Sequence, residues 1–379
     1  MGTDHGCGEL YPELDTPALV VDVDVMEGNL AAMAEGARRR GVALRPHIKT
    51  HKSPWIAHRQ LAHGAVGVTA AKLGEAQVMA DAGITDILVA YPIVGELKLR
   101  RLEALLDMAR VTVALDSLEA AEPLSRLGRR RGEPIPVYME VDTGLRRLGV
   151  PPASPEALDL ARKLAALPGL RLAGITTHGG HVARARTYQE LARLARAQAE
   201  ALVATADMLR RAGLPVNQVS TGSTPAARFE LEVDGITEIR PGTYVFYDAN
   251  CVAQGVVPPE RCAARIVATV VSRPAPDRAV IDAGSKTISP EAREDGSYGI
   301  VVGRPDLILN RLSEEHGIIE LHPAARGSGG AIADLAVGHR LAIIPNHICP
   351  CVNLSDVLYA ARGGRILWEI PVAARGARR

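Results

Sequence analysis

The feature that most constrains the fold is an alternation, across the first two thirds of the chain, of short β-branched runs with amphipathic stretches of helical period. Such an alternation is typical of βα units around a parallel sheet. The segments expected to form strands are residues 18–23, 43–48, 65–70, 87–91, 111–115, 136–141, 170–177, 217–220 and 238–246. The helical segments expected between them include residues 26–40, 73–82, 96–108, 155–166 and 188–212.

These strands are one more than the eight of a (β/α)8 barrel. A helix follows the first strand before the regular alternation begins, so we assign that strand to a second domain and start the barrel strands near Ala43. Strand-like runs separated by Gly and Pro turns then follow at residues 263–271, 279–283, 340–344 and 366–370. The sequence therefore predicts an α/β protein with a TIM-type (β/α)8 barrel over residues 24–250. An antiparallel β domain is expected over residues 251–379, joined by the N-terminal strand of residues 1–23.

Composition argues against several classes of partner. The 44 basic and 43 acidic side chains leave a net charge of +1, which gives no reason to expect nucleic acid. No apolar run reaches the roughly 18 residues of a membrane span, and residues 1–12 are polar and unlike a signal peptide. The five cysteines have no regular spacing, so a disulfide framework is not expected. We therefore expect a cytoplasmic protein that binds neither nucleic acid nor membranes.

Chemically versatile residues follow several of the expected barrel strands. They lie in the segments Arg-Pro-His-Ile-Lys-Thr-His-Lys (45–52), Asp-Thr-Gly-Leu-Arg-Arg-Leu-Gly (142–149), Thr-His-Gly-Gly-His (177–181), Ser-Thr-Gly-Ser-Thr-Pro (220–225) and Arg-Pro-Gly-Thr-Tyr (240–244). A barrel of this kind places its active site at the C-terminal ends of its strands, so we expect these segments to share one rim. The small-residue loops expose backbone N–H groups that suit a phosphate. Lys49 ends an apolar strand, where desolvation lowers the pKa of an amine and favours a Schiff base.

The segment at residues 45–52 resembles the cofactor-lysine motif of the fold-type III pyridoxal-phosphate enzymes related to D-threonine aldolase and D-serine dehydratase. These enzymes share their barrel with alanine racemase, and the resemblance runs from Thr-Pro-Ala (16–18) to Pro-Asn-His-Ile-Cys (345–349). It implies that Lys49 carries pyridoxal 5'-phosphate. It also implies that the phosphate lies on Ser223, Gly242 and Thr243. In the same way it implies that Arg147 lies near the phenolic oxygen of the cofactor and that Arg240 pairs with its pyridine nitrogen.

His347 and Cys349 are an imidazole and a thiol two residues apart. In a strand, side chains at this spacing point to the same face, so both could bind one divalent metal ion such as Zn, Mn or Mg. In the enzymes that this chain resembles, the position of Cys349 is typically aspartate in D-threonine aldolases and cysteine in D-serine and D-3-hydroxyaspartate dehydratases. Racemases of this fold bind no catalytic metal there.

The resemblance implies a lyase that acts on β-hydroxy D-amino acids, in one of two ways. Retro-aldol cleavage of D-threonine to glycine and acetaldehyde requires a base for the hydroxyl proton, and His178 or His181 could provide it. Dehydration of D-serine or D-3-hydroxyaspartate to a keto acid and ammonia is the alternative. A racemase or a non-catalytic pyridoxal-phosphate carrier would not need the His347 and Cys349 pair. By analogy with fold-type III enzymes we expect a homodimer.

Several residues also admit simpler interpretations. Lys52 could be the cofactor lysine, and Cys351 could be a third metal ligand. Arg240 could pair with Glu238 or Asp234 and never meet the cofactor ring.

Overall fold

The computed structural model describes residues 10–325, 332 and 334–379. The chain divides into two compact units, each of which is assembled from separate stretches of sequence. One unit comprises residues 30–244 and 376–379, and the other comprises residues 1–29 and 245–375. Among the helices in the described part of the chain, none is long and apolar enough to cross a membrane.

The first unit is built on a sheet of eight parallel strands in the order β2-β9-β8-β7-β6-β5-β4-β3. The strands are β2 (Ala43–Leu44), β3 (Val68–Ala70), β4 (Asp86–Val89), β5 (Arg110–Leu115), β6 (Ile135–Glu140), β7 (Leu170–Thr176), β8 (Gln218–Thr221) and β9 (Glu238–Ile239). A parallel bridge between His47 and Thr69 joins the continuation of β2 to β3, so the sheet closes on itself. The TIM-type barrel expected from the sequence is confirmed.

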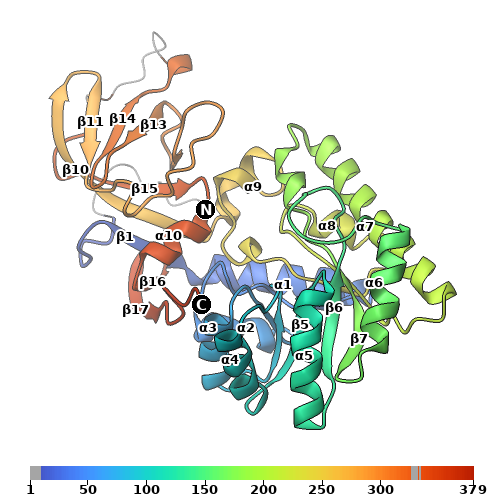
Figure 1. The fold of residues 1–379 in the computed structure, drawn as a ribbon. Coiled ribbons are helices and arrows are strands. Elements are labelled where there is room, and N and C mark those ends of the chain that lie inside the picture. The colour runs from blue at the N-terminus through green and yellow to red at the C-terminus, as the bar shows by residue number, and fades with distance from the viewer. Residues whose placement is uncertain (1–9, 326–331, 333) are drawn as a thin grey trace. The chain divides into compact units, whose positions relative to one another are not determined.

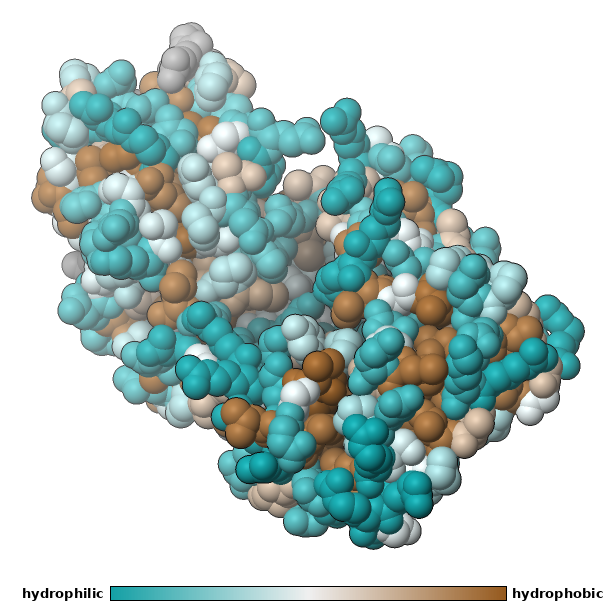
Figure 2. Space-filling model, in the orientation of Figure 1, coloured by the Kyte–Doolittle hydropathy of each residue, from teal (hydrophilic) through white to brown (hydrophobic). Residues whose placement is uncertain are grey.

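Helices follow the barrel strands and form the outer layer of this unit (Figure 1). They are α2 (Pro54–Ala62), α3 (Leu73–Asp81), α4 (Glu96–Leu106), α5 (Leu118–Arg131), α6 (Pro155–Ala166), α7 (Tyr188–Arg211) and the short α8 (Ala227–Glu230). Two 3-10 turns, η1 (Gly180–Arg184) and η2 (Thr243–Val245), follow β7 and β9. The helix α1 (Val23–Arg39) precedes the first barrel strand. Figure 2 shows hydrophilic side chains over much of this helical layer on the face drawn, with hydrophobic patches between them.

Local signals explain why some predicted boundaries agree with the structure and others do not. The helix α6 begins where predicted because Ser154 caps it by accepting a hydrogen bond from the Ala157 N–H at 3.1 Å, and Pro155 occupies its first position. The last predicted strand, residues 238–246, is wrong beyond Ile239. Pro241 has no N–H to donate to a neighbouring strand, and the chain turns into η2 soon after it.

The second unit contains a sheet of nine strands, with the order β13-β14-β11-β10-β1-β16-β17 and with β15 pairing both β10 and β12. The strands are β1 (Ala18–Asp22), β10 (Ala264–Ala275), β11 (Arg278–Ile281), β12 (Gly299–Val301), β13 (Leu307–Leu312), β14 (Gly317–Leu321), β15 (Arg340–Pro345), β16 (Val357–Arg362) and β17 (Arg365–Pro371). The pairs are antiparallel except that β1 runs parallel to β16. The β domain expected after the barrel is therefore present, with one parallel pair in an otherwise antiparallel sheet.

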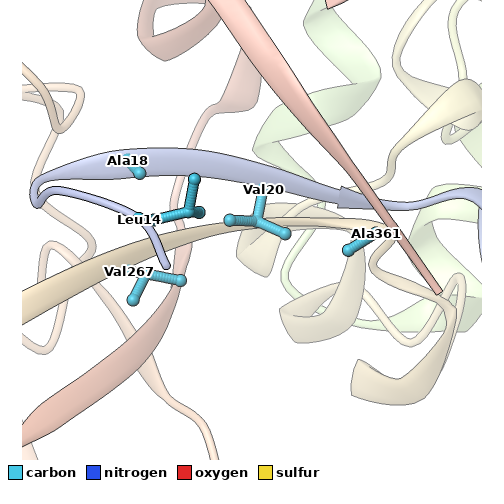
Figure 3. Packing of buried hydrophobic residues seen from close by; sticks show 5 residues of the cluster. All are labelled: Leu14, Ala18, Val20, Val267 and Ala361. Atoms are coloured by element: carbon cyan, nitrogen blue, oxygen red, sulfur yellow. The ribbon is translucent and has the colours of Figure 1, made fainter. Parts of the chain in front are cut away.

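The strand β1 lies in the middle of this sheet and supplies part of its core. Ala18 and Val20 point to one face of β1, where they pack with Leu14, Val267 and Ala361 (Figure 3). All five side chains are buried. Burial of apolar surface is the main favourable term in folding, so this cluster stabilises the position of β1 in the sheet. The other strands of this sheet all follow residue 263.

The prediction of a strand around His347 and Cys349 is wrong. The strand β15 ends at Pro345, His347 is the residue that precedes a helix, and Cys349 lies in that helix, α10 (Ile348–Leu354). Pro350 explains the difference, because a proline is tolerated in the first turn of a helix and removes a hydrogen bond from a central strand.

Candidate active site

The rim of the barrel brings together the segments that follow five of its strands. Lys49 follows β2, Arg147 follows β6, and His178 and His181 follow β7. Ser223 follows β8, and Arg240, Gly242 and Thr243 follow β9. Because all eight strands are parallel, these segments lie at the same end of the barrel.

Lys49 and His178 are close enough for their charges to interact. Burial lowers the pKa of His178 to about 3, and the positive charges of Lys49 and Arg147 add to this effect. Burial and then the charge of Lys49 also lower the pKa of His47. The imidazole of His178 is therefore neutral at pH 7, and the charge of Lys49 acts on it.

The hydrogen bond of His178 fixes which ring nitrogen carries the proton. Its Nδ1 lies 3.0 Å from the carbonyl oxygen of Gly222, and a carbonyl oxygen can only accept. Nδ1 is therefore the donor, and Nε2 is the nitrogen with a lone pair. Gly180 faces this nitrogen, since a Cβ there would lie 3.2 Å from Nε2.

His181 lies on the turn η1 and packs against Gly144, where a Cβ would come within 3.1 Å of its Nε2. Its Nδ1 is buried and has no hydrogen-bond partner among the described residues. Burial lowers the pKa of His181 as well, against the opposing charge of Asp142. Both histidines are thus neutral imidazoles at pH 7, and the charge of Lys49 contributes to the lowered pKa of His178.

Lys52 is held in an ion pair away from the role of cofactor lysine. Its Nζ lies 2.6 Å from Oε1 of Glu75, and both side chains are buried. The other oxygen of Glu75 accepts the Ala71 N–H at 2.8 Å. This ion pair engages the amine of Lys52, which favours Lys49 over Lys52 as the cofactor lysine.

The two small-residue loops are fastened to each other and to the segment that contains Lys49. The Arg240 N–H donates to Thr221 O at 2.8 Å, and the Tyr244 N–H donates to Thr224 Oγ1 at 3.0 Å. A Cβ on Gly242 would lie 2.9 Å from Thr50 Oγ1, so the two segments approach closely only because this residue is glycine. In the first of these loops, residues 220–225, the buried Ser223 Oγ has no hydrogen-bond partner in the described part of the chain. A buried hydroxyl without a partner requires one, and an anionic oxygen would satisfy it.

Arg240 is buried and is held by two neighbouring strands. Its Nη2 donates to Thr177 O at 2.7 Å, and its Nη1 donates to Ser220 Oγ. The sequence left open a direct ion pair between Arg240 and Glu238. In the structure the two side chains are linked through Ser220, whose Oγ donates to Glu238 Oε1 at 2.6 Å.

Two buried carboxyl groups near the rim were not identified from the sequence. Burial raises the pKa of Glu140, at the end of β6, to about 7, against the charges of Arg240 and Arg147. Burial likewise raises the pKa of Glu230 to about 7, and its Oε1 accepts a hydrogen bond from Thr221 Oγ1 at 2.8 Å. The sequence feature that could have identified both residues is an acidic residue in or beside an otherwise apolar segment.

His347 and Cys349 lie together in the other unit. The thiol of Cys349 hydrogen-bonds to the His347 ring, and His347 Nδ1 lies 2.9 Å from Glu291 Oε2. Burial would lower the pKa of His347, but Cys349 and Glu291 outweigh it and raise the pKa to about 9. Among the described residues, no group of three or more His, Cys, Asp or Glu side chains is arranged to hold a metal ion.

Cys351 is engaged elsewhere and fully buried. Its Sγ accepts a hydrogen bond from the Ser289 N–H at 3.1 Å and donates to His347 O at 3.4 Å. These contacts give it a structural role between two loops, which argues against Cys351 as a third ligand.

Family models match both parts of the chain. The alanine racemase N-terminal domain matches residues 21–250, and a serine dehydratase domain matches residues 263–361. The chain belongs to the alanine racemase N-terminal domain family. Curated relatives match over nearly the whole chain. One is a D-threonine aldolase of Arthrobacter sp, which is 36% identical over 97% of this chain and 95% of that protein.

A second relative is a D-threo-3-hydroxyaspartate dehydratase of Delftia sp. (strain HT23), 39% identical over 89% of this chain and 91% of that protein. The structure of a D-threonine aldolase from Filomicrobium marinum matches with a TM-score of 0.90, 34% identity and 100% coverage of both chains. A cysteine-to-alanine variant of a D-threo-3-hydroxyaspartate dehydratase, described as metal-free, matches with a TM-score of 0.85 and 34% identity. That match covers 94% of this chain and 97% of the dehydratase chain.

Proposed function

We propose that this chain is a metal-dependent pyridoxal-phosphate lyase that cleaves β-hydroxy D-amino acids by a retro-aldol reaction, converting D-threonine to glycine and acetaldehyde. The observation that carries this proposal is the neutral His178 at the rim, whose Nδ1 is bound to Gly222 O, whose Nε2 is unprotonated and whose pKa is lowered by burial and by the charge of Lys49. Retro-aldol cleavage requires a base for the substrate hydroxyl proton, and an imidazole of this kind can accept it. We further propose that the enzyme acts in the cytoplasm as a homodimer.

The residues of the rim fit pyridoxal 5'-phosphate. The unpartnered Ser223 Oγ, together with the loop at Gly242 and Thr243, would hold the phosphate. Lys49 would bind the cofactor covalently, Arg147 would lie near its phenolic oxygen, and Arg240 would lie at its pyridine nitrogen. When bound, the cofactor acts as an electron sink for bonds at the substrate α-carbon.

His178 is proposed to take the proton from the substrate hydroxyl, with His181 as the second candidate. Its Nδ1–H bond to Gly222 O orients the ring and keeps Nε2 as the acceptor. Arg240, as a buried cation, would keep the pyridine nitrogen unprotonated, which limits removal of the α-proton and so limits racemisation.

His347 and Cys349 are proposed to hold a divalent metal ion, and an imidazole with a soft thiolate favours Zn over Mn or Mg. A metal in that place would supply Lewis-acid assistance at the substrate hydroxyl. Glu291 would orient His347, since a carboxylate on Nδ1 leaves Nε2 for a ligand bond.

Dehydration of D-serine or D-3-hydroxyaspartate is the second candidate function. Cys349 favours this function, because the aldolases that the chain resembles typically have aspartate at this position and the dehydratases have cysteine. In that reaction Lys49 would take the α-proton, and the hydroxyl would leave.

The two functions are distinguished by their products. The protein loaded with pyridoxal phosphate and Zn is incubated in turn with D-threonine, D-serine and D-3-hydroxyaspartate, and with L-threonine as control. We expect glycine and acetaldehyde from D-threonine and no product from L-threonine. Ammonia with pyruvate or oxaloacetate, without acetaldehyde from D-threonine, would assign the chain to the dehydratases.

A further inference from the structure

A continuous line of charged and polar side chains runs through the interior of the barrel to Arg240. Arg45 Nη1 lies 2.6 Å from Asp86 Oδ1, and Arg45 Nε lies 2.7 Å from Glu238 Oε2. Glu238 Oε1 accepts the Ser220 hydroxyl at 2.6 Å, and that hydroxyl oxygen accepts Nη1 of Arg240. At the outer end, Asp86 pairs with the exposed Arg110.

Several of the side chains in this line are buried, which makes their charges energetically costly unless they are paired. Ser220, Glu238 and Arg240 are 0%, 1% and 5% exposed. A buried charge is costly unless it is paired and hydrogen-bonded. Glu238 is therefore shared between two cations: it contacts Arg45 directly and reaches Arg240 through one hydroxyl group.

The hydroxyl of Ser220 has a single hydrogen, and this fact gives the line a direction. Because Glu238 can only accept, the hydrogen points to Glu238, and a lone pair of the oxygen is left to face Arg240. A second acceptor, Thr177 O, binds Nη2 of Arg240 at 2.7 Å. The guanidinium group is thereby fixed in its plane from two adjacent strands.

We propose that Ser220 and Glu238 are positioning residues that hold Arg240 against the pyridine nitrogen of the cofactor and partly balance its charge. This inference rests on the proposed function, since it takes the cofactor and the place of Arg240 from there. Arg45 fixes Glu238 from the other side, so the electronic state of the cofactor nitrogen is set from within the barrel.

Glu238→Gln tests the direction of the hydroxyl group. A glutamine amide can donate to Ser220 Oγ, which would turn the hydroxyl hydrogen toward Arg240 and remove its acceptor. Ser220→Ala removes the link outright, and Ser220→Thr restores a hydroxyl. Glu75→Gln is the matched control, because Glu75 is an equally buried carboxylate of this barrel, 2% exposed, paired with a different cation, Lys52.

The readout is the ¹⁵N NMR shift of cofactor labelled at the pyridine nitrogen, together with the dissociation constant of pyridoxal phosphate. We expect Glu238→Gln and Ser220→Ala to change the shift and to weaken cofactor binding about tenfold, the worth of a hydrogen bond to a charged group. Ser220→Thr and Glu75→Gln should keep the wild-type shift.

The outcomes separate this inference from the proposed function. If the wild-type protein binds no pyridoxal phosphate, the proposed function falls, and the positioning role falls with it. If the wild-type protein binds the cofactor and both Glu238→Gln and Ser220→Ala retain its shift and affinity, the positioning role alone is overturned. Should Glu238→Gln fail to fold, the pair Ser220→Ala and Ser220→Thr decides the question.

Discussion

The barrel rim and the His347 region organise their chemistry in opposite ways. The rim gathers residues from five segments between residues 49 and 243, and each follows a different parallel strand. His347 and Cys349 are instead two positions apart, at the start of one helix. A site built from strand ends depends on the whole barrel, whereas a site built from adjacent residues depends on one local turn. Substitutions at the rim should therefore alter cofactor binding, whereas substitutions at His347 should leave cofactor binding unchanged.

The largest expected effect is at Lys49. Lys49→Ala should remove the visible absorbance of bound pyridoxal phosphate and all turnover, because Lys49 is the lysine proposed to bind the cofactor covalently and the neighbouring Lys52 is paired with Glu75. Borohydride reduction of the wild-type protein followed by peptide mapping should place the label on Lys49. A label on Lys52 would show that its ion pair with Glu75 does not prevent the reaction.

Removal of the metal should separate the two regions. His347→Ala, or treatment with a chelator, should lower turnover by about 10³-fold, since a Lewis acid supplies several kcal/mol of charge stabilisation. Cofactor absorbance should stay unchanged, because the proposed cofactor contacts lie in the barrel unit. Cys351→Ser is the control, since its sulfur is bound to backbone groups, and metal content measured by mass spectrometry should remain as in wild type. Full activity of metal-free protein would remove the metal from the mechanism.

Within the rim, the two histidines can be ranked. His178→Asn should lower turnover by about 10²- to 10⁴-fold, the usual contribution of a positioned base, while cofactor absorbance is kept. The same change at His181 should have the smaller effect, because the charge interaction with Lys49 belongs to His178. Steady-state rates with D-threonine provide the measurement, and a reversed order would make His181 the base.

The rim should also be sensitive to acid. Burial lowers the pKa of His51 to about 4, below its unfolded value of 6.5, so the unfolded chain binds the proton more readily. The contribution of neutral His51 to stability is therefore complete above pH 6.5 and decreases as the pH falls toward 4. Over this interval the loss is about 3 kcal/mol. Urea unfolding at several pH values should show a shallower pH dependence for His51→Gln than for wild type; equal slopes would contradict the assignment.

The smallest effect tests a purely local signal. Ser154→Ala should lower the free energy of unfolding by about 1 kcal/mol, because Ser154 Oγ accepts the Ala157 N–H at the start of α6. Ser117→Ala is the matched control, since Ser117 precedes α5 without a side-chain capping bond. Thermal unfolding of the two variants gives the comparison, and equal shifts in Tm would mean that the cap contributes nothing specific.

The parts of the structure that sequence could predict are those governed by periodicity. The alternation of strands and helices predicted the barrel, and the positions after the strands predicted which segments share the rim. Conformations set by single residues were less predictable, as the short strand before Pro241 and the helix at Cys349 illustrate. The line from Arg45 to Arg240 was missed because it joins side chains up to 195 positions apart, and a hydrogen-bond chain leaves no periodic signal.

The ion pair between Lys52 and Glu75 has a consequence for self-protection. An enzyme that releases an aldehyde exposes its own amines to that product at every turnover. Lys52 lies only three residues from Lys49, but its Nζ is held 2.6 Å from a buried carboxylate and is engaged there. In the proposed function, this one carboxylate on α3 would keep Lys52 from forming adducts with the aldehyde product.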